Sequence, residues 1–375
     1  MNPLFFLYNN KNQKKESNIE FEANEEIIKS MCILSNMYIA IGKNDGYIII
    51  YDINNKNKIY NNKIFDNSIS CLLTSKDQSC FFSCSESTIK YFSLISDINL
   101  LYKSKYILNE IKNIKIHDSI ITKLEYLDDD IYASCSMDSS FIIWKFKNNN
   151  INILLKLKDQ SNGLVYFLLE KENNLFNNLV TLNKKGTLSF YKIFTEQNYK
   201  STLKKVILNI DYTNSNSIQK IENDIFIGGY NYLQVISIKN MQIQTTIKIK
   251  SPISYIYKSI NNFLVLGLKN GSLKFMTEKY FHNLNEKDIQ ELEKNYIGFH
   301  FSILFKNGEA KIFDDDKSII KFIILDSRFI CISDESIKIL KNKQDEITLK
   351  TSNKLPSSSI FTDTKNYFSN LINNI

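Results

Sequence analysis

Pairs of short β-rich runs joined by a tight turn recur along this chain, and this repetition constrains the fold more than any single motif. The segment Tyr132–Phe146 is the clearest copy, because small residues end its first run, Asp138 lies in the turn and Phe141–Phe146 forms the second run. Similar segments occur at Tyr38–Asp52, Cys80–Ser93, Leu179–Lys192, Ile225–Ser237, Phe263–Met276, Phe301–Asp314 and Arg328–Leu340. We expect each copy to form a two-stranded hairpin.

The spacing of these copies favours a repeat architecture. The place of Trp144 in its copy corresponds to Tyr51, Phe92, Tyr191, Ile236, Met276, Phe313 and Leu340 in the others. Successive positions are therefore 41, 52, 47, 45, 40, 37 and 27 residues apart. Every interval except the last is long enough for a four-stranded unit, whereas the last leaves room for one strand between hairpins. We expect seven units, with eight as the alternative.

The third copy resembles a WD repeat. In that repeat a His opens the unit, and a Ser, an Asp and a Trp follow at fixed places, which are matched here by His117, Ser134 (or Ser136), Asp138 and Trp144. The resemblance implies an all-β WD40 propeller with a buried structural tetrad. It also implies a hydrogen-bonded chain that runs from the Trp144 indole through the Ser hydroxyl and the His117 imidazole to the Asp138 carboxylate. The other copies lack the His, the Trp or the Asp.

The WD40 resemblance covers about residues 25–345 and predicts one domain rather than two. We place the propeller in residues 1–350 and a tail in residues 351–375. Phe5–Tyr8 and Ile19–Glu22 are typical of short strands ahead of the first repeat. Because a ring must join its first and last blades, we expect an N-terminal strand to help close it.

Two segments depart from the repeat pattern. Asn285–Lys294 is charged and helix-prone, and we expect it to be an insertion in the sixth repeat. In the tail, Thr362 or Asp363 can cap a short helix. An apolar stripe at helical spacing would lie on that helix, formed by Tyr367, Phe368, Leu371, Ile372 and Ile375. Two interpretations are open: the stripe binds a groove of a partner protein, or it packs on the propeller.

Charge and composition bear on the possible partners. The content of 13% aromatic residues and the many isoleucines favour strands, and the formal charge of +7 is mild for 375 residues. Three basic stretches, Leu101–Tyr106, Ile111–Asp118 and Ile247–Ser251, are either solvated strand edges and loops or places of loose RNA contact. Arg328 is the only arginine, which argues against sequence-specific DNA binding, because bidentate reading of guanine normally uses arginine.

Cysteine usage and hydropathy indicate the compartment. The 6 cysteines fall mostly in predicted strands, which is typical of buried free thiols in an intracellular protein. Cys80 and Cys84 are close, but no second pair and no nearby His completes a zinc spacing. No apolar run of about 18 residues predicts a membrane span, and the N-terminal PLFFLY is too short for a signal peptide. We expect a cytoplasmic or nuclear protein with no metal site.

Signatures of catalysis are not found in the sequence. It contains no GxxxxGK, GxGxxG, GxSxG or HExxH motif, and its 3 histidines are His117, His282 and His300. The aspartate triplets Asp128–Asp130 and Asp314–Asp316 fall where turns are expected, so solvated turns explain them better than a cation site. We expect no catalytic residues and no cofactor.

WD40 propellers as a family hold several partners at once, so the resemblance implies a non-catalytic scaffold of an intracellular multiprotein complex, with other proteins as its partners. The alternative is a WD-repeat ribosome-assembly factor on pre-ribosomal particles, to which the segment His117–Asp138 and the mild basicity bear some likeness. A third class is a WD-repeat hydrolase of the diphthine methylesterase kind, for which the sequence shows no nucleophile and base.

Overall fold

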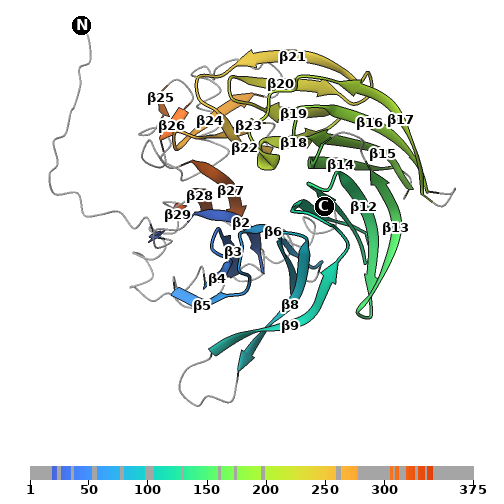
Figure 1. Cartoon of the computed structure of the whole chain (residues 1–375). Helices are drawn as coiled ribbons and strands as arrows, with labels where there is room; N and C mark the ends of the chain where they lie inside the picture. The colour runs from blue at the N-terminus through green and yellow to red at the C-terminus, as the bar shows by residue number, and fades with distance from the viewer. Residues whose placement is uncertain are drawn as a thin grey trace, which may run out of the picture.

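The computed structural model describes residues 19–340 apart from 23–26, 35–37, 53–56, 77–79, 98–104, 129, 159–161, 173–174, 196–198, 259–262, 278–304, 307–308, 312–317, 326–327 and 334–335. The described strands form antiparallel sheets that follow one another around a central axis (Figure 1). The chain is therefore an all-β propeller, as predicted. The predicted tail, residues 351–375, and the insertion Asn285–Lys294 lie outside the described residues.

Five sheets contain four strands each, in chain order. The first is β2 (Ile28–Ile33), β3 (Tyr38–Lys43), β4 (Tyr47–Asp52) and β5 (Asn57–Lys63). The second is β6 (Ile69–Thr74), β7 (Cys80–Ser85), β8 (Thr88–Asp97) and β9 (Lys105–Lys115), and the third is β10 (Ile121–Asp128), β11 (Ile131–Ser136), β12 (Ser140–Lys147) and β13 (Asn150–Lys158). The fourth is β14 (Leu164–Glu172), β15 (Leu175–Asn183), β16 (Leu188–Phe194) and β17 (Lys200–Ile207). A short 3₁₀ helix, η2 (Ser215–Ser217), precedes the fifth, which is β18 (Ile218–Ile221), β19 (Asp224–Gly228), β20 (Tyr232–Ser237) and β21 (Gln242–Lys248).

The sixth sheet explains why eight hairpin copies do not make eight blades. It contains β22 (Ile253–Lys258), β23 (Phe263–Leu268) and β24 (Ser272–Thr277). The predicted hairpin Phe301–Asp314 supplies β25 (Phe305–Lys306) and β26 (Glu309–Lys311), and β26 pairs with the edge of β24. This copy therefore extends the sixth sheet and does not form a unit of its own.

The last sheet joins the two ends of the ring. It consists of β27 (Ile319–Leu325), β28 (Arg328–Ser333) and β29 (Ser336–Leu340), and its fourth strand is β1 (Ile19–Glu22). β1 runs antiparallel to β29, with Ile19 opposite Ile339. Within the described chain, six blades are continuous in sequence, which differs from the seven units expected, because the last sheet is assembled from both ends of the chain. The other predicted early strand, Phe5–Tyr8, lies outside the described residues.

Burial differs between the middle and the outer strands of a blade. Middle strands such as β3, β7 and β11 are buried on both faces after their first residue, because a neighbouring blade covers each face. Outer strands such as β17 and β21 are mostly exposed or half-buried. The core therefore lies between blades: one cluster contains Phe82 of the second blade together with Trp144 of the third.

A repeated side-chain-to-backbone hydrogen bond holds the first residue of most inner strands. The inner strands begin with buried aliphatic residues, namely Ile28, Ile69, Ile121, Leu164, Ile218, Ile253 and Ile319. The backbone carbonyls of five of them accept a hydrogen bond from the preceding blade or from the segment before η2: Ser30 Oγ to Ile69 (2.9 Å), Cys71 Sγ to Ile121 (3.8 Å), Thr122 Oγ1 to Leu164 (2.7 Å), Thr213 Oγ1 to Ile253, and Ser254 Oγ to Ile319. These bonds fix the position of one blade against the next.

Close packing also requires glycine at this contact. A Cβ atom at Gly42 would lie 2.5 Å from Ile69 Cγ2, and a Cβ atom at Gly228 would lie 2.5 Å from Ile253 Cγ2. Real side chains do not approach so closely, so these middle strands need glycine where the next inner strand begins.

Candidate functional site

The structure brings His117, Ser134, Asp138 and Trp144 together within the third blade. Trp144 Nε1 donates to Ser134 Oγ (3.3 Å), and Ser134 Oγ lies 2.8 Å from His117 Nε2. His117 Nδ1 lies 3.1 Å from Asp138 Oδ2. These contacts form the chain of hydrogen bonds that the WD repeat implies. Ser136, the alternative serine, instead donates to the carbonyl of Ser119 (3.0 Å) and accepts from the backbone of Asp138.

A neutral His117 with its proton on Nδ1 satisfies every group in this chain. Ser134 then donates to Nε2 while it accepts from Trp144, and Nδ1–H donates toward Asp138. Burial lowers the pKa of His117 below its usual 6.5, and the neighbouring Asp138 only partly opposes this shift. The histidine is therefore uncharged near neutral pH, as this arrangement of protons requires.

Ser140 is a fifth member of the cluster that sequence reasoning missed. Its Oγ lies 2.8 Å from His117 Nδ1 and donates to Asp138 Oδ1 (2.6 Å). Its backbone N–H donates to the same carboxylate, and the N–H of Asp118 does so as well. Burial raises the pKa of Asp138, but these hydrogen bonds outweigh burial and hold it below 3.8. The Asp-x-Ser spacing across the turn was the available signal.

The Ser–His–Asp part of the cluster has the order of contacts found in a hydrolytic triad. However, Ser134 is 0% exposed and His117 is 1% exposed. The Trp144 indole, which is itself 0% exposed, donates to the oxygen that would have to act as the nucleophile. A substrate carbonyl cannot reach Ser134 Oγ in this geometry.

Two neighbouring blades retain the serine position but have lost its partners. Ser83 of β7 and Thr181 of β15 occupy the place that Ser134 has in β11, and both are fully buried. Among the described residues, no hydrogen-bond partner meets Ser83 Oγ or Thr181 Oγ1. These two blades thus carry the hydroxyl without the His and Trp that contact it in the third blade.

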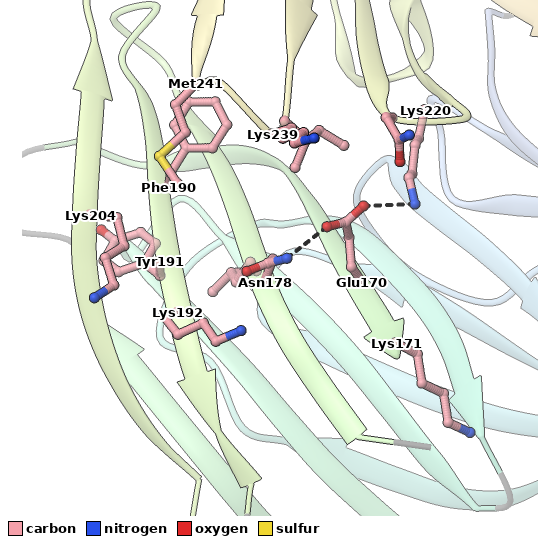
Figure 2. Close-up of a pocket in the computed structure, with 13 residues that line it drawn as sticks. Glu170, Lys171, Asn178, Phe190, Tyr191, Lys192, Lys204, Lys220, Lys239 and Met241 are labelled. Atoms are coloured by element: carbon pink, nitrogen blue, oxygen red, sulfur yellow. Dashed lines mark hydrogen bonds and ion pairs between the residues drawn. The ribbon is translucent and has the colours of Figure 1, made fainter. Parts of the chain in front are cut away.

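A cavity of about 520 Å³ lies between the fourth and fifth blades (Figure 2). Five lysines line it: Lys171, Lys192, Lys204, Lys220 and Lys239. Glu170 is the single acidic residue of the lining, and its carboxylate accepts from Lys220 Nζ (2.8 Å) and Asn178 Nδ2 (2.9 Å). The lining therefore has a formal excess of four positive charges. Several of these residues lie at the β14–β15, β18–β19 and β20–β21 turns, so the cavity opens on that side of the ring.

Sequence reasoning did not find these lysines. They come from β14, β16, β17, β18 and the β20–β21 turn, and only the stacking of two blades gathers them. The basic stretches that the sequence does show, such as Ile247–Ser251, contribute nothing to this cavity. An alignment of the repeats with one another would have located the site, because it would place each lysine near the same end of its blade.

A second cavity, of about 280 Å³, lies among the inner strands β2, β6 and β10. Its lining includes three long polar side chains, those of Lys29, Lys123 and Asn216. The Nζ of Lys123 donates to the carbonyl of Phe167 (2.8 Å) and lies 3.9 Å from the ring centroid of Tyr166. This lysine is thus engaged by the neighbouring blade.

The other predicted site residues lie in parts of the chain that the structure does not describe. The candidate partner-binding residues Tyr367, Phe368, Leu371 and Ile372 lie outside the described residues, as do His282, His300 and the triplet Asp314–Asp316. Across the described segments, no three His, Cys, Asp or Glu side chains gather as a metal site would require. In the same segments no helix is long and apolar enough to cross a membrane.

Comparison with known proteins identifies no relative, so any inference about function depends on the fold and the geometry of the site. No protein-family model matches the chain, and no curated protein matches its sequence. The architecture is that of the β-propeller class, and its third blade carries the hydrogen-bonded cluster of His117, Ser134, Asp138 and Trp144.

Proposed function

We propose that this protein is a WD40-type propeller that acts as a non-catalytic scaffold within an intracellular multiprotein complex. In this proposal the composite sheet of β1 and β27–β29 closes the ring. The hydrogen-bonded cluster of His117, Ser134, Asp138 and Trp144 is a structural tetrad that fixes the third blade. Partner proteins bind to the turns and cavities that the ring presents.

The observation that carries the proposal is the burial of the Ser–His–Asp cluster. The side chains with the chemistry of a hydrolase are enclosed in a blade, whereas the larger cavity is open and lined by lysines and apolar groups. A rigid ring with recessed, charged binding places suits the recognition of partners. The same burial weighs against the hydrolase reading, because the diphthine methylesterase kind of activity needs an accessible nucleophile.

The state of the cysteines supports an intracellular placement. None of the 6 cysteines, all of which the structure describes, is in a disulfide, and four of them, Cys32, Cys84, Cys135 and Cys331, are buried. Cysteines outside disulfides are typical of a reducing compartment, and we place the protein in the cytoplasm or the nucleus. The single arginine keeps sequence-specific DNA outside the proposed partners.

Affinity purification of the tagged protein from its own cells, with and without RNase and followed by mass spectrometry, tests the proposal. We expect a small set of partners that resists RNase. Pre-ribosomal proteins that are lost on RNase treatment would instead establish the ribosome-assembly alternative. Recovery of the protein alone would contradict both, and ester turnover by the pure protein would refute the non-catalytic role.

A further inference from the structure

We propose that the lysine cavity between the fourth and fifth blades docks a carboxylate-rich segment of a partner protein. This cavity is the one lined by Lys171, Lys192, Lys204, Lys220 and Lys239. The inference rests on the proposed scaffold function and adds the location and the chemistry of one binding place.

The charges of the cavity are incompletely compensated from within the protein. Lys220 is paired with Glu170, and Lys171 is paired with Asp128 of the third blade. For Lys192, Lys204 and Lys239, no acidic oxygen of the described residues lies within ion-pair distance. These three lysines line the same cavity, so an anionic ligand bound there would be attracted.

A β-bulge places one of these lysines in the lining of the cavity. β16 pairs with β17 in a register that matches Phe190 with Lys205 and Tyr191 with Leu203, so Lys204 is the extra residue of a β-bulge. A bulge re-aims the side chain of the bulged residue. Lys204 lines the cavity, whereas its neighbour Lys205 does not. Lys192 lies opposite Asn178 in the pairing of β15 with β16, and Figure 2 shows both residues in the cavity.

Apolar residues form part of the cavity floor, which favours a peptide over a nucleic acid. Leu179, Phe190 and Ile238 are buried residues of the lining, and Met241 packs beside them. A peptide that carries both carboxylates and apolar side chains satisfies the lysine rim and this floor together. The volume of about 520 Å³ suits a few side chains and offers no long cationic track for a phosphate backbone.

Fluorescence anisotropy with a defined probe tests the site. The probe is a fluorescein-labelled peptide that alternates glutamate with phenylalanine and leucine, and its control has glutamine in place of each glutamate. We expect binding of the glutamate peptide by the full chain, weaker binding as salt rises, and little binding of the control. The double variant Lys192→Gln/Lys239→Gln should weaken binding about tenfold, because each exposed ion pair contributes up to about 1 kcal/mol.

Lys205→Gln is the matched control, because it removes a charge from β17 next to Lys204 but outside the cavity, and it should bind as the wild type does. Equal binding by the double variant and the wild type, or no binding of the glutamate peptide, would overturn the inference. So would tighter binding of single-stranded RNA that the double variant abolishes. Affinity purification separates the two proposals: if the double variant keeps every partner, the cavity assignment fails while the scaffold function stands.

Discussion

Matched substitutions of the equivalent serines in two neighbouring blades test the role of the tetrad. Ser134→Ala removes the hydroxyl that joins Trp144 Nε1 to His117 Nε2, and both of these buried groups lose their partner. Each such loss costs about 1–3 kcal/mol. Because the bond from Trp144 is long at 3.3 Å, we expect a total of about 3 kcal/mol in the free energy of unfolding.

Ser83→Ala changes the same kind of side chain at the same place in the second blade, and the outcome should differ. Ser83 Oγ is buried without a hydrogen-bond partner among the described residues. Its removal eliminates a desolvated polar group, so stability should stay unchanged or rise by about 1 kcal/mol. The free energies of unfolding of the two alanine variants should therefore differ by about 3–4 kcal/mol, with Ser134→Ala the less stable.

Urea unfolding followed by fluorescence and circular dichroism measures both values. Trp144 is the only tryptophan of the chain, so its emission reports directly on the third blade. Circular dichroism reports on all strands and shows whether the blades unfold together. Equal effects of the two substitutions, or a larger loss for Ser83→Ala, would show that the hydrogen-bonded chain does not stabilise the blade and would refute the reasoning.

Three further outcomes are expected. Burial lowers the pKa of His117, so as pH falls the unfolded state binds the proton first. The free energy of unfolding should therefore fall as pH drops below 6.5, by at most about 1.4 kcal/mol per pH unit. Urea unfolding at several pH values should show that this dependence on pH is smaller for His117→Gln. Gly42→Ala should lower the melting temperature by several degrees, because its Cβ would meet Ile69 at 2.5 Å, and an unchanged value would contradict the contact. Deletion of residues 355–375 should leave the circular dichroism unchanged but remove one co-purified partner, whereas an unfolded truncated chain would place the tail in the core.

The features that the sequence predicts well are those with local signals. Each hairpin has its own turn and its own β-rich runs, so strand pairs such as β11 and β12 follow from short windows. The cluster is predicted through the resemblance to a WD repeat, whose Ser, Asp and Trp places are matched within one hairpin by Ser134, Asp138 and Trp144. His117 could be added because it precedes that hairpin in the same repeat.

Other features depend on which blades become neighbours, and short windows carry no such information. The hairpin at Phe301–Asp314 resembles the other copies, yet β26 pairs with β24 and extends an existing sheet. The orphan hydroxyls of Ser83 and Thr181 are visible only once the surrounding side chains are placed. The lysine cavity requires the relative position of two blades, because its residues are spread from Glu170 to Met241.

The pairing of β1 with β29 means that the ring can close only after the last strands of the chain have been synthesised. Roughly 300 residues separate these strands, so their meeting is the most distant strand contact described in the chain. During synthesis every other blade can assemble before the partner of β1 exists, and until then a strand edge stays open to strands of other chains. Aggregation during production should therefore depend on the last strands of the ring and on how soon β1 finds them.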